Sequence, residues 1–310
     1  MTAYSTLYRA LVGLSDHEAQ VTLEHGSNPK KSGTIVTDNV QNHLSQTDHR
    51  IGRSNVMNVG LAATYIEMED IPESAFDLED KQQRLAENKR GKLTVEQLLG
   101  MVDTKHVNVV FILHWLRILV NFIPQLSKWK EHVSMHFRER AKRLPLAPQA
   151  TKVHPLATCG KNETVSTELK NALVDFLGQI GQTPEKYHKR LLLVGGDGLT
   201  YEKMITLKKY LQFHSDPFQS LEILEPVLAL WHTEWTDVNH VFEAHWDTHL
   251  SVNPLSLGHS AAKIGQNAPK NVKKIDYYQG VELMNTVLEA RILDCWRYGF
   301  QLFLAHAISH

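Results

Sequence analysis

The chain has 310 residues, of which 42% are apolar and 22% are charged, and its formal net charge is −1. This length provides for one large domain or two ordinary ones with a substantial core, and the composition excludes a disordered chain. A near-neutral sequence has no overall basic field, so any contact with nucleic acid must come from local patches.

The cysteines and the apolar segments indicate where the protein resides. Cys159 and Cys295 provide neither a disulfide framework nor a zinc-ribbon spacing, which favours a reducing, intracellular compartment. The N-terminus lacks the basic-then-apolar pattern of a signal peptide. The most apolar run, Val107–Ile123, contains Arg117, whose insertion into the middle of a bilayer would cost about 3 kcal/mol. We therefore expect a buried amphipathic helix there and no membrane partner.

The predicted elements alternate between strands and helices from the N-terminus onward. A short helix over 6–12 precedes a strand at 34–37 that ends at Asp38, and 56–68 contains one or two β segments. The charged stretch 70–91 is expected to be a surface excursion. Helices follow at 94–102, 107–123 and 128–143, and Pro124 separates the last two. The remaining expectations are a loop (144–159), a helix (165–180), a strand (191–197), a helix (204–213), a strand (221–231), a helix (238–246) and one or two helices (281–307).

The most informative segment is Lys189–Met204, KRLLLVGGDGLTYEKM. Its continuously apolar start is typical of a strand that is buried on both faces, and Gly195-Gly196-Asp197 ends that strand. Thr200 is expected to cap the following helix. Ligands gather at the carboxyl ends of strands in open α/β sheets, so Asp197 is a candidate site residue. The alternative is a turn aspartate that caps the next helix.

Seven segments occur in a fixed order along the chain: VTDNVQNH (36–43), HPLATCGKNETV (154–165), LLLVGGDGLTYEKM (191–204), LALWHTEWTDV (228–238), SLGHSA (256–261), KKIDYY (273–278) and ARILDCWR (290–297). Together they resemble a fungal family known as domain of unknown function 6589, from about Tyr4 to about Phe300. Its members are similar to transposon-borne proteins, and a strand ending in Asp-Asn followed later by one ending in Gly-Asp is similar to RNase H-like transposases. Asn253 stands where the family pattern has an aspartate. The chain also opens and closes inside the pattern, which suggests a fragment.

The resemblance implies an α/β fold with an RNase H-like mixed sheet, a large helical insertion and C-terminal helices. We expect one domain over residues 1–310, with the insertion at about 93–143. An apolar stripe in this insertion is expected to be core, and alanine at Phe111 would then cost about 3–5 kcal/mol. The stripe consists of Val109, Phe111, Ile112, Leu116, Leu119 and Val120.

The chemistry of this fold depends on carboxylates that hold two Mg²⁺ or Mn²⁺ ions for phosphodiester cleavage or strand transfer. Asp38 and Asp197, at the ends of two adjacent strands, are the expected catalytic metal ligands. Asp294 or Glu289 would complete the site, and because they are five residues apart they lie on different helix faces. Asp38 has an alternative role as a turn residue beside Asn39.

The 18 histidines offer a rival metal site. The pairs His245/His249 and His132/His136 each have the four-residue spacing that zinc sites use on a helix, although so many histidines make such pairs common. His232 follows an apolar strand and could orient a carboxylate or contact a phosphate beside Asp197; its alternative is a structural hydrogen bond. Nucleotide-binding glycine motifs are absent, so we expect no dinucleotide. Local basic patches for phosphates lie at 138–143 and 270–274.

Two hypotheses therefore stand. The first is a transposase-derived, Mg²⁺-dependent nuclease or strand-transfer domain that acts on DNA, which implies a nuclear location. The second is a non-catalytic, domesticated binding or scaffold protein that retains the fold, for which the location is cytoplasmic. The retention of Asp38 and Asp197 favours the first hypothesis, whereas Asn253 and the near-neutral charge favour the second.

Overall fold

The computed structural model describes residues 4–45, 54–69, 71–143 and 148–308, and it divides the chain into two compact units. The first unit combines residues 1–92 with 149–232, and the second combines 93–148 with 233–310. Each unit thus contains two separate stretches of sequence. The single domain expected over residues 1–310 stays a prediction, and the two units are described one at a time below.

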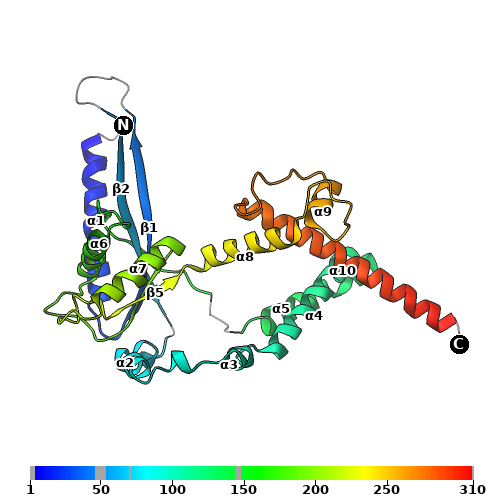
Figure 1. Cartoon of the computed structure of the whole chain (residues 1–310), viewed down its shortest axis with the longest axis horizontal. Coiled ribbons are helices and arrows are strands. Elements are labelled where there is room, and N and C mark those ends of the chain that lie inside the picture. Colours follow the sequence, from blue (N-terminus) through cyan, green and yellow to red (C-terminus); the bar gives the residue numbers. More distant parts are fainter. Residues whose placement is uncertain (1–3, 46–53, 70, 144–147, 309–310) are drawn as a thin grey trace. The chain divides into compact units, whose positions relative to one another are not determined.

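The first unit contains a five-stranded mixed sheet with strand order β3-β2-β1-β4-β5 (Figure 1). Strand β1 pairs antiparallel with β2, which pairs antiparallel with β3, whereas β4 runs parallel to both β1 and β5. The expectation of a mixed α/β sheet is confirmed, and so is the adjacency of the first strand and the Gly-Gly-Asp strand. The strands are β1 (Ser32–Leu44), β2 (Val56–Met68), β3 (Val153–Pro155), β4 (Leu192–Gly196) and β5 (Leu224–Leu228).

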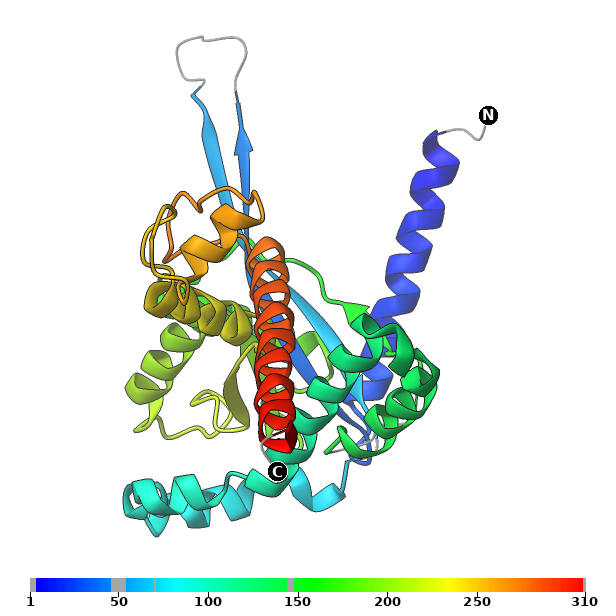
Figure 2. The ribbon, with the colours of Figure 1, turned by 90° about the vertical axis from the view of Figure 1, so that its right-hand side faces the viewer.

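Strand β1 is longer than the sequence predicts. It continues past Asp38 to Leu44, and its last residue pairs with Val56 at the start of β2 (Figure 2). The predicted end of this strand at Asp38 is therefore wrong, and so is the alternative of a turn at Asp38-Asn39. A β-branched partner strand of equal length offers pairing throughout β1, and this pairing outweighs the local turn preference of Asp and Asn. Side chains alternate along β1, with Ile35 and Thr37 buried and Val36 and Asp38 exposed.

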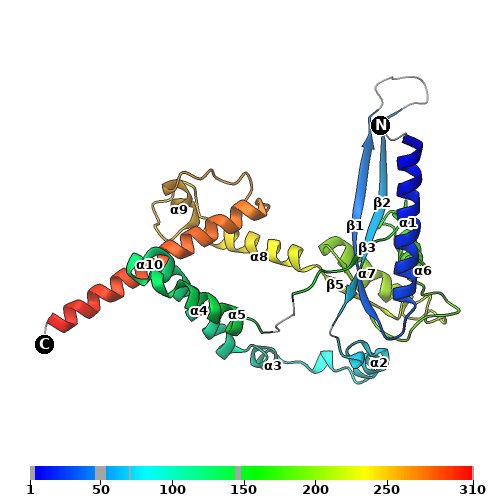
Figure 3. The same ribbon diagram turned by 180° about the vertical axis from the view of Figure 1, so that it is seen from behind.

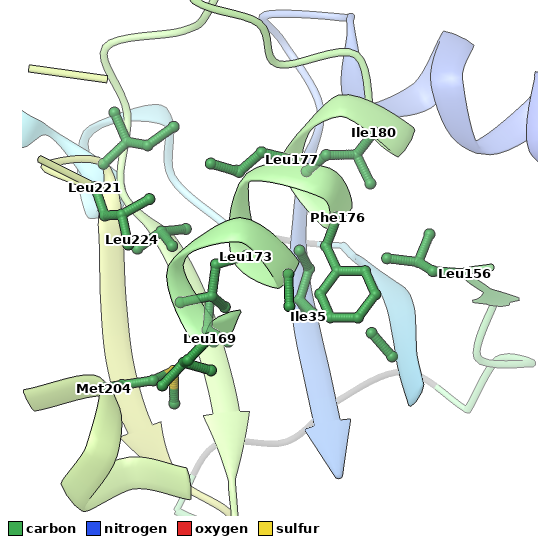
Figure 4. Packing of buried hydrophobic residues seen from close by; sticks show 14 of the residues in the cluster. Ile35, Leu156, Leu169, Leu173, Phe176, Leu177, Ile180, Met204, Leu221 and Leu224 are labelled. Atoms are coloured by element: carbon green, nitrogen blue, oxygen red, sulfur yellow. The ribbon is translucent and has the colours of Figure 1, made fainter. Parts of the chain in front are cut away.

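The core of the first unit lies between the sheet and α6 (Ser166–Gln179). Leu169, Leu173 and Phe176 project from α6 toward Ile35 of β1, and Met204 of α7 (Gly198–Leu211) joins them (Figure 4). This helix is amphipathic, as its apolar spacing predicts, because one face must cover the sheet. The third short strand, β3, lies within the segment expected to be a loop, and residues 144–147 of that segment are outside the described residues.

The first unit also contains α1 (Tyr4–Gly26) and α2 (Leu78–Ala86). Helix α1 is three times the length that the sequence predicts, because good helix formers such as Ala19 and Gln20 continue it. Its N-terminal part stands apart from the β1–β2 hairpin, as Figure 2 shows, and Leu7 and Leu11 are exposed there. Two 3₁₀ turns, Glu73–Phe76 and Arg90–Lys92, flank α2. Helix α8 (Leu230–His245) begins in this unit and continues into the second.

The second unit is helical and has its own core. It contains α3 (Val95–Gly100), α4 (Thr104–Phe122), a 3₁₀ turn (Pro124–Trp129), α5 (Lys130–Arg140), α9 (Leu257–Lys263) and α10 (Tyr277–Ile308). Figure 3 shows α9 beside the first part of α10, which contacts it. Together with α8, these helices bury a cluster that includes Phe242, Trp246 and Leu283. Among the described residues, we find no helix with the length and apolar character that crossing a membrane requires.

The structure corrects the apolar stripe of α4. Phe111 and Ile112 are 61% and 60% exposed, so they are not core residues. The buried positions are Leu113, Ile118, Leu119 and Val120. An almost continuously apolar helix does not reveal which of its faces packs, because its periodicity is weak.

Candidate functional site

Asp197 lies where β4 ends and α7 begins. Its Oδ1 accepts a hydrogen bond of 2.7 Å from the backbone N–H of Thr200, so Asp197 is the N-cap of α7. The prediction that Thr200 is the cap is therefore wrong; Thr200 is the third helical residue and is fully buried. A Cβ on Gly196 would come within 2.7 Å of the Thr200 methyl group, so only glycine lets the first turn of α7 pack this closely.

Asp38 lies on β1, which pairs with β4, the strand that precedes Asp197. The parallel register pairs Ile35 with Val194 and Val36 with Gly195. The pairing ends there; continued by two residues, the same register would align Asp38 with Asp197. Asp38 is exposed, and its Oδ1 accepts a hydrogen bond of 2.8 Å from the backbone N–H of Asn39. The two carboxylates thus belong to neighbouring strands, Asp38 in the middle of β1 and Asp197 just after the end of β4.

Glu163 is a third carboxylate near β1, on the face that Asn39 presents rather than that of Asp38, and it is absent from the residues that the sequence singles out. It is 2% exposed, although it lies in the loop before α6. Its Oε1 accepts from the Asn39 side-chain amide at 2.8 Å, and its Oε2 accepts from the Thr200 hydroxyl at 2.7 Å. A buried carboxylate is costly unless it is hydrogen-bonded, so these two bonds are needed. The sequence signal was its place in the family-like segment KNETV (161–165).

The contacts of Glu163 join three parts of the first unit. Asn39 belongs to β1, Thr200 belongs to α7, and Glu163 itself precedes α6. The carboxylate therefore fixes the first turn of α7, which Asp197 caps, to the strand that carries Asp38. The result is a polar, hydrogen-bonded cluster at the carboxyl end of the parallel strands. We call Asp38, Asn39, Glu163, Asp197 and Thr200 the strand-end cluster.

His232 lies in the first turn of α8, shortly after β5. The backbone N–H of Ala229 donates to the Gly196 carbonyl at 3.0 Å, which ties the start of α8 to the end of β4. The His232 ring is half-buried, with its centroid 4.8 Å from that of Trp231. A role for His232 beside Asp197 stays a prediction.

Glu289 and Asp294 lie on α10, in the second unit, whereas the strand-end cluster belongs to the first. Asp294 is exposed and accepts a hydrogen bond of 2.6 Å from Arg297, three residues later on the same helix. Their role as third ligand stays a prediction. Glu163 is a further carboxylate of the first unit, bonded to the residue after Asp38 and to the helix turn that Asp197 caps.

The histidine pairs differ in their setting. Helix α8 ends at His245, so His245 and His249 do not share a helix face, and the His249 ring stacks on Trp246 at 6.1 Å. His132 and His136 do lie on one helix, α5, with 3.2 Å between their Nε2 atoms. In the part of the chain that the structure describes, no three His, Cys, Asp or Glu side chains surround a common metal position. Because Mg²⁺ keeps several waters and uses few protein ligands, this finding does not bear on a site of two carboxylates.

The comparisons with known proteins identify a family. The model of the family of unknown function DUF6589 matches residues 88–307. This range includes Glu163, Asp197 and His232, whereas Asp38 precedes it. No curated protein and no solved structure matches the chain.

Proposed function

The chain belongs to this family of unknown function, and we propose that its first unit is an RNase H-like domain, derived from a transposase, that cleaves or joins DNA strands with Mg²⁺ or Mn²⁺. The sheet supports this proposal, since three antiparallel strands followed by two parallel ones in the order β3-β2-β1-β4-β5 agree with an RNase H-like fold. The observation that carries the proposal is the parallel β1–β4 pairing, whose register, continued two residues beyond Val36 and Gly195, would align Asp38 with Asp197.

The donor set fits a hard divalent cation. Asp38 and Asp197 each use Oδ1 in a local hydrogen bond, and Oδ2 takes no part in these bonds. Glu163 accepts one hydrogen bond on each oxygen, and a carboxylate oxygen has a second lone pair. Carboxylate oxygens are the ligands that Mg²⁺ prefers, and waters or substrate phosphates complete its shell. Asp38 and Asp197 would hold the cation.

Each residue of the strand-end cluster has a distinct task in this proposal. The bound cation would supply charge stabilisation to the phosphodiester. Asp38 and Asp197 bind and orient it from two strands, while Glu163 holds the first turn of α7 against β1. Because the cluster lies on a sheet and a helix start, its geometry is fixed before substrate binds. His232, in the first turn of α8, would contact a phosphate of the substrate.

A non-catalytic scaffold is the second candidate function, and a specific observation favours it. Every carboxylate of the cluster already has a structural role: Asp197 caps α7, Asp38 binds the next backbone amide, and Glu163 joins β1 to α7. These bonds alone would explain why the residues are present. A test must therefore separate the charge of the carboxylates from their hydrogen bonds.

The Asp197→Asn variant makes this separation, because asparagine is as good an N-cap as aspartate but carries no charge. We expect calorimetric titration with Mn²⁺ to give saturable binding to the wild type and at least tenfold weaker binding to Asp197→Asn and to Asp38→Asn, with melting temperatures little changed without metal. Weaker Mn²⁺ binding to Asp294→Asn would identify the α10 carboxylate as a further ligand. Cleavage of single- and double-stranded DNA should require Mn²⁺ and both aspartates. Equal, weak binding to all proteins would favour the scaffold, and binding without cleavage would indicate a relic site.

A further inference from the structure

A second polar cluster lies in the first unit, where α1 meets β2 and β3. Glu67 of β2 is at its centre, with its side chain 9% exposed. His25 of α1 approaches one carboxylate oxygen, with 3.3 Å between Nε2 and Oε2. His154 of β3 approaches the other, with 3.0 Å between Nε2 and Oε1. Both histidines are buried, so one carboxylate holds a helix and an edge strand together.

The second ring nitrogen of each histidine has a different partner. Nδ1 of His25 lies 3.0 Å from the hydroxyl of Tyr65, a group that can donate or accept. Nδ1 of His154 lies 3.1 Å from Oε2 of Glu18, a carboxylate that only accepts. His154 thus faces a carboxylate on both sides. Both of its hydrogen bonds exist only if both nitrogens carry a proton.

The two histidines therefore require different protonation states. A neutral His25 satisfies its site completely, because its Nε2–H donates to Glu67 while Nδ1 accepts from Tyr65. A neutral His154 would turn a lone pair toward Glu18 or Glu67. We propose that these contacts form a proton-dependent clamp, in which a doubly protonated His154 and a neutral His25 together fasten α1 to the β2–β3 edge.

The electrostatics of the surrounding groups agree with this assignment. Burial lowers the pKa of His25, and the charges of Lys31, His154 and Lys152 lower it further against the opposing Glu67. Burial also raises the pKa of Tyr65 to about 12, so its hydroxyl keeps the proton that it donates. Burial would raise the pKa of Glu67, but hydrogen bonds from His154 and Lys152 outweigh it and lower the pKa. The charged and titratable groups around the clamp are Glu18 and His25 of α1, Tyr65, Glu67 and Glu69 on the β2 side, Lys152 and His154 on the β3 side, and Lys31 and Arg190 from loops.

The clamp loosens at both ends of the pH range. Because the folded-state pKa of His25 is depressed, its contribution is complete above the usual histidine value of about 6.5 and is lost as the pH falls below it. A neutral His154 can donate to only one carboxylate, so the clamp has one bond fewer at any pH that leaves this ring neutral. The docking of α1 should therefore be tightest at an intermediate pH, with a bell-shaped profile.

Hydrogen exchange read by mass spectrometry tests this profile between pH 5 and 9, after correction for intrinsic exchange. Protection of residues 16–26 and of β3 should fall about tenfold at each end, the factor expected for one lost charge-assisted hydrogen bond. Protection of α6 should stay constant. A monotonic profile, or a parallel change in α6 that indicates global unfolding, would overturn the clamp.

Three variants identify which residue causes the loss of protection at low pH and which causes the loss at high pH. Glu18→Gln supplies an amide N–H to a neutral His154, so it should abolish the loss at high pH. His25→Gln imitates the neutral ring, since it donates to Glu67 and accepts from Tyr65, and should abolish the loss at low pH. Glu24→Gln makes the same charge change on an exposed position of α1 and should behave as the wild type. If Glu18→Gln lost protection at high pH as the wild type does, the proposal would be contradicted.

Nuclear magnetic resonance of the wild-type histidine rings gives a measurement that does not depend on any variant folding. At the pH of greatest protection, His154 should show the imidazolium signature with both nitrogens protonated. His25 should show the neutral ring with its proton on Nε2. A neutral His154 at this pH would overturn the clamp.

Discussion

Lys208 lies in the last turn of α7, and its ammonium group contacts the start of β5. Its ammonium group donates to the Leu221 carbonyl at 3.1 Å and to the Leu224 carbonyl. Burial, together with the nearby charge of Lys81, lowers the pKa of Lys208 to about 8 against the opposing carboxylate of Glu225. The folded protein therefore releases this proton more readily than the unfolded chain does.

This shift predicts how stability changes with pH. Between pH 8 and the unfolded lysine value of about 10.4, the unfolded chain binds more protons, so the free energy of unfolding should rise with pH. We expect a gain of about 1 kcal/mol between pH 7.5 and 9 in the wild type that Lys208→Met loses. Denaturant titration at both pH values measures it. The exposed neighbour variant Lys209→Met is the control and should keep the full gain.

At the residue scale, the sequence correctly predicted that Asp197 follows a buried strand, whereas Asp38, expected at the end of its strand, lies in the middle of β1. Asp197 was recognised because a buried apolar strand and two glycines precede it. Glu163 was not, because its burial depends on Asn39 and Thr200, which are more than thirty residues away in either direction. Nothing in the local pattern of a polar loop indicates that one of its carboxylates is inaccessible to solvent. Long-range hydrogen bonds are the part of this site that spacing does not encode.

At the scale of elements, the β1–β2 hairpin likewise shows that contacts with a distant segment override a local sequence preference. The bounds predicted for β2 agree with the structure at both ends, because its β-branched and small residues favour a strand throughout. The end of β1 was predicted too early, because Asp38-Asn39 has a local turn preference that only pairing with β2 overrides. Strand length is thus decided by the partner as much as by the strand's own residues.

Helix α4 provides a prediction at this scale. Its apolar residues extend around more than one face, and only the structure identifies the packed one. Ile118 is 2% exposed, so Ile118→Ala should lower the free energy of unfolding by about 2–5 kcal/mol. Phe111 is 61% exposed, so Phe111→Ala should change it by no more than about 0.5 kcal/mol. Denaturant unfolding of both variants distinguishes them, and a larger loss for Phe111→Ala would restore the original assignment of the stripe.

At the scale of the whole molecule, the two units alternate along the sequence. The chain leaves the sheet after residue 92, forms α3, α4 and α5, returns at residue 149, and leaves again within α8. The sequence predicted the helices between residues 93 and 148, because proline and capping residues mark their ends. It did not predict that these helices and the C-terminal helices form one unit, since contacts between distant segments leave no local pattern.

The separate cores predict how the whole chain unfolds. Phe176 is fully buried in the core of the first unit, and Phe242 is 3% exposed in that of the second, and neither cluster contains residues from the other unit. Cores that share no residues can melt independently, so we expect two calorimetric transitions. Alanine at either phenylalanine should cost about 3–5 kcal/mol and lower only the transition of its own unit. The Mn²⁺ expected at Asp38 and Asp197 should raise only the transition that Phe176→Ala lowers. One transition that shifts with both substitutions would mean that the two units fold as a single cooperative body.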